Sequence, residues 1–451
     1  MALWIAYILT AAAAFAGGFD ARFETIKREA TARELYSLLY DLPKGGDIHH
    51  HLGLSSWASD LWASATDSAI HKGNEFYTRM QIKGCQGDSF PALRFLNIDR
   101  KTYQQLADCG QSEFQPLSKL TAAERDAWHS SLILDLPGEG RNEFFEAIVL
   151  RSVALFRNPD LLKDQMIRML RRYGRENIRY VESQTSSAAA QVDAIRSALA
   201  SKEAVESGVA MRLQNVIIRF HPQAEENLKK AYEFVAANRD LFVGVNMAGR
   251  EDNDKGHALR FLDTFRQMRR THSGIHLSIH GGEKDSPGSE VRHTLLLGAE
   301  RIGHGLNLIT DPDTMLLMRN GRHLVESNLV SNQLLEYTPD LSKHPFPEYL
   351  RFGIPVCLNT DDSGVWDSQF TDEYFLAIRH FKLTWKEVVT IGRNSLAYSF
   401  AEPELKAKLL ASYDSAVTAF ERRYDRSDWR APLNSVRPEV SGYARRRLGI
   451  D

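Results

Sequence analysis

The residues of this chain best suited to chemistry begin with a run of three histidines, in the segment DIHHHLG at residues 47–53. In a β-strand, residues i and i+2 point to the same face, so His49 and His51 can reach one metal ion while His50 points away. A His-x-His pair in isolation is more often part of a solvated loop. The pair therefore predicts a metal site only if the sequence supplies further ligands.

Two later segments supply them, each at the end of a short apolar run. HLSIHGGEKD, at residues 276–285, contains His280 and, three residues later, Glu283. LNTDD, at residues 358–362, contains Asp361. Imidazole nitrogens and a carboxylate oxygen suit zinc, and three histidines with one aspartate leave room for a water molecule, whose pKa zinc lowers to about 7. The predicted metal ligands are His49, His51, His280 and Asp361.

Eight short apolar segments have the length and composition of β-strands, and amphipathic helical segments such as residues 142–174 and 224–238 separate most of them. Alternating strands and helices predict a parallel sheet, and eight of them suggest closure into a (β/α)8 TIM barrel of the α/β class. The candidate site residues fall at or near the carboxyl ends of these strands, where barrel enzymes carry catalytic groups. The expected strands are residues 46–52, 177–183, 213–220, 241–248, 274–281, 301–305, 323–330 and 354–360.

These segments, in this order, resemble the adenosine deaminase family of metal-dependent hydrolases over about residues 44–400. The resemblance is strongest to the secreted, growth-factor-type adenosine deaminases. It implies hydrolytic deamination of adenosine, or of a related aminopurine, to the 6-oxo product (inosine) and ammonia. The segments that carry the resemblance are PKGGDIHHH, FEAIVL, HGGE, RIGHG, ESNLVSNQLL and LNTDD.

The resemblance also implies a role for each site residue. The four predicted ligands would bind one zinc ion per chain, Glu283 would shuttle protons, and His304 would orient and stabilise the attacking hydroxide. Gly249 and Asp362 would hydrogen-bond the purine ring. The reaction itself needs such a set, because displacing ammonia from C6 requires a hydroxide, a proton on N1 and a base. Without the other groups, His304 would be interpreted as a buried histidine at a turn and Gly249 as a turn glycine.

The sequence departs from the family on the sugar side of the substrate. Adenosine deaminases commonly carry a ribose-binding aspartate directly after the second histidine, or two residues after it, and here those positions are Leu52 and Gly53. Deamination of the ring is therefore a firmer prediction than the identity of the sugar. Adenosine, deoxyadenosine, adenine and modified adenosines all remain open as substrates.

The catalytic domain is expected to hold an insertion over the barrel mouth, because the segment after the first strand is rich in polar turns and short helical pieces. Growth-factor-type deaminases carry an inserted subdomain at this place. They also often have a longer N-terminal dimerisation region, so the short lead-in of this chain leaves its oligomeric state, monomer or dimer, open. The expected divisions are a signal peptide at 1–16, a helical lead-in at 17–43, the barrel at 44–400 with its insertion at about 55–140, and a C-terminal helix and tail at 401–451.

The N-terminal segment ALWIAYILTAAAAFA is too short to span a membrane but suits an exported leader cleaved between Ala16 and Gly17. We therefore expect a secreted or periplasmic protein that is free of the membrane after cleavage. In an exported protein Cys85 and Cys109 could form a disulfide, although a reduced pair is a fair alternative. Cys357, in the strand that leads to Asp361, is interpreted as a small buried hydrophobic residue.

The charge balance of the chain restricts the classes of molecule that it is expected to bind. The chain has 56 basic and 58 acidic residues, and this balance argues against nucleic acid as the main partner. The expected partner is a small purine. Two alternatives remain: another metal hydrolase of the same barrel class, which would cut an amide or ester, and a non-catalytic, growth-factor-like binding protein. Many metal hydrolases of this barrel class use two metals and a bridging lysine, and none of the matched segments supplies that lysine. A binding protein would be favoured if one of the metal ligands were missing from the sequence.

Overall fold

The computed structural model describes residues 18–85, 90–186, 188–251 and 254–451. The expected leader at residues 1–16 lies outside the described residues. Among the described residues, no helix combines the length and the hydropathy needed to span a bilayer.

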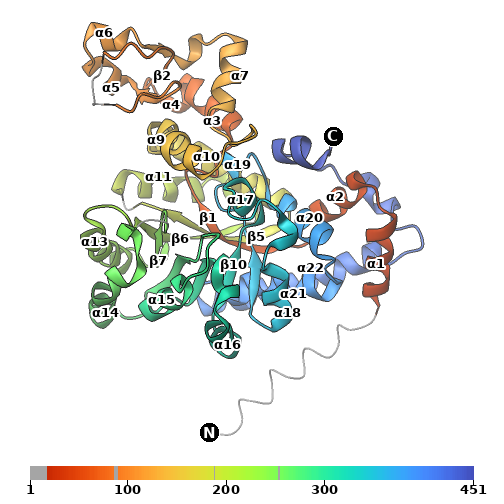
Figure 1. Cartoon of the computed structure of the whole chain (residues 1–451). Coiled ribbons are helices and arrows are strands. Elements are labelled where there is room, and N and C mark those ends of the chain that lie inside the picture. Colours follow the sequence, from red (N-terminus) through yellow and green to blue (C-terminus); the bar gives the residue numbers. More distant parts are fainter. Residues whose placement is uncertain (1–17, 86–89, 187, 252–253) are drawn as a thin grey trace.

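Eight parallel strands form the centre of the molecule and follow one another in chain order around the sheet (Figure 1). A parallel bridge between His50 and Asp361 joins the last strand to the first, so the sheet closes. The expected (β/α)8 barrel is therefore confirmed. Its strands are β1 (Gly45–His51), β5 (Ile178–Thr185), β6 (Ala210–Ile218), β7 (Phe242–Ala248), β8 (His276–Gly281), β9 (Arg301–His304), β10 (Leu324–Ser327) and β11 (Val356–Leu358).

Helices surround the barrel, as expected of parallel strands that are buried on both faces. Strand residues such as Val181, Val245 and Leu277 are buried in the hydrophobic core that includes these helices. The helices after β5 are α11 (Ala189–Leu199), α12 (Lys202–Glu206), α13 (Ala224–Ala237), α14 (Leu262–Thr271), α15 (Glu290–Leu297), α16 (Pro312–Asn320), α17 (Leu329–Leu334), α18 (Phe346–Phe352), α19 (Ser363–Trp366), α20 (Phe370–Phe381), α21 (Trp385–Ala397) and α22 (Pro403–Tyr424).

The segment expected to be helical over residues 142–174 is helical, and the structure divides it into several pieces. Asn158 ends the first part and caps the second, since its side chain accepts hydrogen bonds from the backbone of Asp160 and Leu161. Pro159 follows at the first helical position, where its missing N–H costs nothing. The resulting pieces are α8 (Arg141–Glu143), a π-helical turn (Phe144–Ile148), α9 (Val149–Phe156) and α10 (Pro159–Arg175).

The segment between β1 and α8 forms a separate unit on the side of the barrel where β1 ends (Figure 1). It contains a three-stranded antiparallel sheet with the order β3-β2-β4, which the sequence did not predict. Its core includes Phe76 and Trp128 and extends to Leu155 and Leu161 on α9 and α10. The elements are α3 (Ala58–Thr66), α4 (Ser68–His71), β2 (Phe76–Arg79), β3 (Asn97–Asp99), α5 (Arg100–Gln105), α6 (Asp108–Gln111), β4 (Phe114–Pro116) and α7 (Ala122–Ser130).

Two helices precede the barrel, α1 (Phe19–Glu29) and α2 (Ala32–Asp41). Thr31 and Glu34 form a capping box at the start of α2, with each side chain accepting from the other residue's backbone. Phe19 packs edge-on against Trp385 of α21 at 4.8 Å between ring centroids. The lead-in is therefore packed against the helices that surround the barrel.

Candidate metal centre and active site

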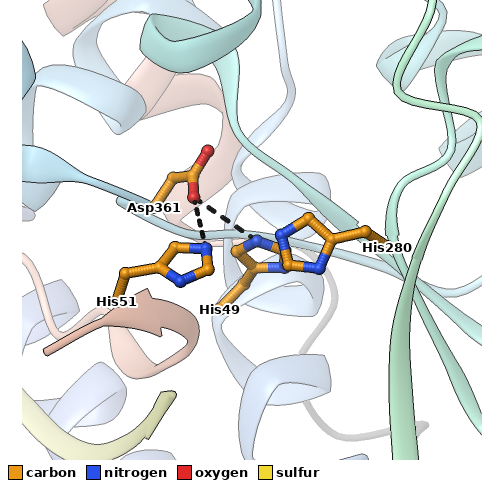
Figure 2. Close-up of side chains that lie close together, drawn as sticks. All are labelled: His49, His51, His280 and Asp361. Atoms are coloured by element: carbon orange, nitrogen blue, oxygen red, sulfur yellow. Dashed lines mark ion pairs between the residues drawn. The ribbon is translucent and has the colours of Figure 1, made fainter. Parts of the chain in front are cut away.

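The four predicted metal ligands come together at the carboxyl ends of the strands (Figure 2). One ligand atom of each lies within 4.8 Å of those of the others, and the side chains come from β1, β8 and the segment just beyond β11. The nearest carboxylate oxygen of Asp361 is 3.1 Å from Nε2 of His51 and 3.5 Å from Nε2 of His49. The cluster is His49, His51, His280 and Asp361.

Asp361 is held in an uncommon backbone conformation, with φ at +57°. Its N–H donates to the carbonyl of His49 at 3.0 Å, and its carbonyl accepts from the N–H of His51 at 3.2 Å and from the hydroxyl of Ser55 at 2.9 Å. Left-handed backbone in a residue other than glycine persists where the surroundings fix it, and such residues cluster at active sites. The same bonds that close the barrel therefore place the carboxylate among the histidines.

Two of the histidine rings are oriented by buried partners. Nδ1 of His49 lies 2.7 Å from a carboxylate oxygen of Glu326, which can only accept, so this nitrogen carries a proton. Nδ1 of His280 lies 3.0 Å from Oδ1 of Asn246. In each ring Nε2 is left for the centre of the cluster, and Nε2 of His49 is buried without a hydrogen-bond partner. A buried ring nitrogen without a hydrogen-bond partner, among other nitrogen and oxygen donors, fits zinc, whose histidine ligands are commonly held in this way.

The two orienting groups belong to one buried polar layer inside the barrel. Glu326 accepts from Arg301 at 2.6 Å, and Arg301 also donates to Glu182 at 2.7 Å. The side-chain amide of Gln214 donates to the carboxylate of Glu182 at 3.0 Å and accepts from the side-chain amide of Asn246 at 3.2 Å. Buried polar groups that are fully paired are rigid, and removing one partner leaves a costly unpaired charge. The layer therefore fixes His49 and His280 relative to each other.

His50 lies on the other face of β1, as the alternation of the strand predicts. Its Nδ1 is 2.7 Å from the hydroxyl of Ser183. Burial lowers the pKa of His50 to about 3, so its ring is neutral. It acts as a structural residue between β1 and β5.

Glu283 lies beside the cluster, in the loop after β8. Its backbone N–H donates to Glu251 at 2.8 Å, and Glu251 pairs with the buried guanidinium of Arg219. Arg219 also donates to the carbonyls of Met247 and His280, so it joins the ends of β7 and β8. Burial raises the pKa of Glu283 well above its usual range, with the charges of Asp361 and Glu251 adding to the shift. A carboxyl of this kind can hold a proton for transfer.

His304 ends β9, is buried, and has φ at +64°. Its Nε2 faces two carboxylates, 3.7 Å from Glu283 and 3.9 Å from Asp361. Burial lowers the pKa of His304 to about 3. The preceding residue is Gly303, and a Cβ there would lie only 2.6 Å from Cε1 of His49, so a larger residue would collide with that ring.

The two residues expected to hold the purine also lie at strand ends. Asp362 is buried directly after the predicted ligand Asp361, and its Oδ1 has no hydrogen-bond partner. Burial raises the pKa of Asp362. Gly249 follows β7 with φ at +101°, and a Cβ there would lie 2.8 Å from the ring of Phe220. A side chain at this position would therefore clash with Phe220 and strain the backbone, and glycine avoids both.

The two positions after His51, where the resemblance would place a ribose-binding carboxylate, hold Leu52 and Gly53. Leu52 is buried, and its N–H donates to the carbonyl of Gln184 at 3.0 Å. Gly53 lies against Phe156, which a Cβ would meet at 2.7 Å. The side-chain amide of Gln184 is buried with neither polar atom hydrogen-bonded, and sequence reasoning did not identify it.

The three cysteines divide into a pair and a single residue. Cys85 and Cys109 form a disulfide within the insertion, with their Cα atoms 5.5 Å apart. Of the two alternatives that the sequence left open, the structure contains the bridged one. Cys357 is a free, buried thiol in β11.

Comparisons with known proteins find a matching family model and similar sequences. The family model described as adenosine deaminase matches residues 142–416. The chain is 33% identical over 177 residues to the adenosine deaminase of Vibrio cholerae, covering 39% of this chain and 52% of that protein. It is 30% identical over 248 residues to the adenosine deaminase-like protein of Drosophila melanogaster, covering 52% of this chain and 70% of that protein. The chain thus spans about half the length of the first curated relatives that it matches.

A solved structure shares the fold at low sequence identity. The adenine deaminase from Arthrobacter aurescens superposes with a TM-score of 0.62 at 18% identity, covering 83% of this chain and 99% of that one. At this identity the likeness supports the barrel architecture alone.

Proposed function

The chain belongs to the adenosine deaminase family, and on that premise we propose that it is a zinc-dependent hydrolase of aminopurines. It would replace the 6-amino group of adenosine, or of a related purine, with oxygen and release ammonia. The observation that carries the proposal is the buried cluster of three histidines and one aspartate with two proton-handling groups beside it. These residues are His49, His51, His280, Asp361, Glu283 and His304.

Zinc fits the cluster because its donors are imidazole and carboxylate and because Nε2 of His49 has no other partner. The ion would lower the pKa of a water molecule to about 7, which makes hydroxide available at neutral pH. The four clustered side chains would hold it, and Glu326 and Asn246 would keep two of the rings in place.

The remaining residues would act on the purine and on the proton. Glu283, whose pKa burial raises, would donate a proton to N1 and so make C6 electrophilic. His304 would orient the attacking hydroxide through its Nε2, which already faces the carboxylates of Glu283 and Asp361. Asp362, with its unpartnered Oδ1, and Gly249 would hydrogen-bond the ring.

The proposal is tested by measuring zinc in the purified protein together with ammonia release from adenosine, deoxyadenosine, adenine and modified adenosines. We expect one zinc per chain and ammonia release from at least one nucleoside. A zinc protein that cuts amides or esters but deaminates no purine would instead be another hydrolase of this barrel class. A protein with neither zinc nor ammonia release would be a binding protein.

We expect weak discrimination at the 5′ position of the sugar. A site built to hydrogen-bond a hydroxyl can reject the analogue that lacks it by ~10⁴-fold or more, whereas a site without such a group rejects it weakly. Leu52 and Gly53 offer no polar side chain, so kcat/KM for adenosine should exceed that for 5′-deoxyadenosine by less than about 10³-fold. A larger preference would contradict this interpretation of the pocket. Gln184, whose amide has no partner, would then be the first residue to replace, as Gln184→Leu.

We also propose that the protein is exported and of the growth-factor type. Disulfides persist mainly in secreted and periplasmic proteins, and Cys85 and Cys109 are joined within the insertion after β1. The insertion has its own sheet, as an inserted subdomain would, and its core is shared with α9 and α10.

A further inference from the structure

A line of buried polar contacts leads from His304 away from the metal cluster. Nδ1 of His304 lies 3.0 Å from Nδ2 of Asn332, a residue of α17. Oδ1 of Asn332 lies 3.1 Å from Nε2 of His344, and Nδ1 of His344 lies 3.1 Å from the backbone nitrogen of Phe346 at the start of α18. His304, Asn332 and His344 are all buried.

The far end of this line determines the direction of every hydrogen bond in it. The backbone N–H of Phe346 can only donate, so Nδ1 of His344 must be bare and the proton of this ring must sit on Nε2. A doubly protonated His344 would point a second N–H at that backbone donor. Burial agrees, because it lowers the pKa of His344 to about 3.

The same logic continues through the asparagine. Nε2–H of His344 donates to Asn332, so the atom that it meets is the amide oxygen. The amide NH2 of Asn332 therefore faces His304 and donates to its Nδ1. A neutral His304 must then carry its proton on Nε2, the nitrogen that faces Glu283 and Asp361.

Asn332 is well placed to impose this order because α17 is itself anchored. The buried carboxylate of Glu373 accepts from the backbone N–H groups of Leu329 and Val330, at 2.8 and 3.0 Å. A second amide, that of Asn328, lies 3.2 Å from Nδ1 of His304, but its Oδ1 has no partner that would fix its direction. The direction is therefore set through Asn332.

We propose that Asn332 and His344 are positioning residues that fix the tautomer and ring orientation of His304, so that its Nε2–H points at the reacting centre. Nδ2 of Asn328 lies 3.5 Å from that nitrogen, and the carboxyl groups of Glu283 and Asp361 lie 3.7 and 3.9 Å from it. The carboxylate of Asp361 accepts hydrogen bonds, and an attacking hydroxide would accept one as well. A bare Nε2 would face them with its lone pair. With the proton on Nε2, His304 can donate to the attacking group, the role that the proposed function gives it.

The tautomer can be read directly by NMR of protein carrying 15N in its histidine rings, because protonated and bare ring nitrogens have distinct shifts. The resonances of His304, one of 15 histidines, are assigned from their loss in His304→Gln. In the wild-type protein we expect Nε2 protonated and Nδ1 bare. The opposite pattern in the wild-type protein would overturn the proposal whatever any variant does.

Asn332→Asp is the sharpest variant, because it keeps the shape and can still accept from His344. Its carboxylate cannot donate, so the proton of His304 should move to Nδ1, or the ring should become doubly protonated. We expect kcat to fall by between about 10² and 10⁴-fold, the range for losing a general acid–base group, with KM and zinc content nearly unchanged. Unchanged His304 resonances together with unchanged kcat would contradict the proposal.

His344 provides a matched pair of variants in case Asn332→Asp does not fold. His344→Phe removes the donor and should leave His304 in a mixture of tautomers, with lower kcat. His344→Gln supplies an N–H again and should restore both readouts at least in part; equal loss in the two variants would indicate a packing role only. The proposal rests on the proposed function only for its effect on kcat: a protein that deaminates nothing but shows Nε2–H would leave the tautomer assignment intact.

Discussion

Replacing Glu283 with glutamine is expected to lower kcat by at least ~10²-fold while the metal and the fold are retained. Glutamine has nearly the same shape and can still hydrogen-bond a ring nitrogen, but it cannot give up a proton and take another. The contact that places this residue is made by its backbone N–H with Glu251, which the substitution leaves in place. Steady-state kinetics, zinc analysis and thermal unfolding of Glu283→Gln are the measurements.

A matched control is Glu300→Gln. Glu300 pairs with His276 at the amino end of β8 and β9, away from the metal cluster. This variant should keep wild-type kcat. Normal turnover by Glu283→Gln would show that the proton-shuttling role assigned to Glu283 is wrong, whereas loss of zinc in that variant would mean that Glu283 supports the metal site instead.

The barrel and its ligand cluster could be predicted because both leave local signals in the sequence. Most strands contain a short apolar run, and the predicted ligands lie at or just beyond the carboxyl ends of β1, β8 and β11, so the carboxyl-end rule of barrels brings them together. The two-residue spacing of His49 and His51 predicted which of the three adjacent histidines face the cluster. The outcome for His50, paired with Ser183 on the opposite face, follows from the same alternation.

The features that the sequence did not predict depend on contacts between distant segments. Strands β2, β3 and β4 have only three or four residues each, too few for a visible alternation. Glu326 and Asn246 are polar residues inside apolar runs, and their partners His49 and His280 lie on other strands. A signal did exist, because a polar residue in a strand buried on both faces needs a partner inside the barrel. The sequence does not say which partner it finds.

His344 and Asn332 show the same limit in sharper form. Nothing in SNQLL or SKHPF indicates that the two side chains meet, because the contact depends on how the chain folds between α17 and α18. The direction of their hydrogen bond depends further on one backbone N–H, that of Phe346. Chemistry of this kind is specified by three-dimensional packing rather than by any local pattern.

Asp361→Ala is expected to lose the metal and a large part of the stability together. The carboxylate is the single oxygen donor of the described cluster and lies beside two of its histidines, His49 and His51 of β1. Its loss should leave zinc far below one per chain after gel filtration. Because a ligand that binds only the folded state stabilises it, losing a metal present at 100 times its Kd costs about 2.7 kcal/mol. Urea unfolding of the two proteins measures this difference.

The chelator response separates metal loss from simple damage to the strand end. Treating the wild-type protein with a chelator should lower its free energy of unfolding toward that of Asp361→Ala, whereas the variant should not respond, because it has no metal to lose. Asp362→Ala is the neighbouring control and should keep zinc and stability while it raises KM, since Asp362 is assigned to the purine. If Asp361→Ala retained one zinc per chain and unfolded at the same urea concentration as the wild-type protein, Asp361 would not be a metal ligand. The fourth ligand would then be another carboxylate beside the cluster, and Glu283 would be the first to examine.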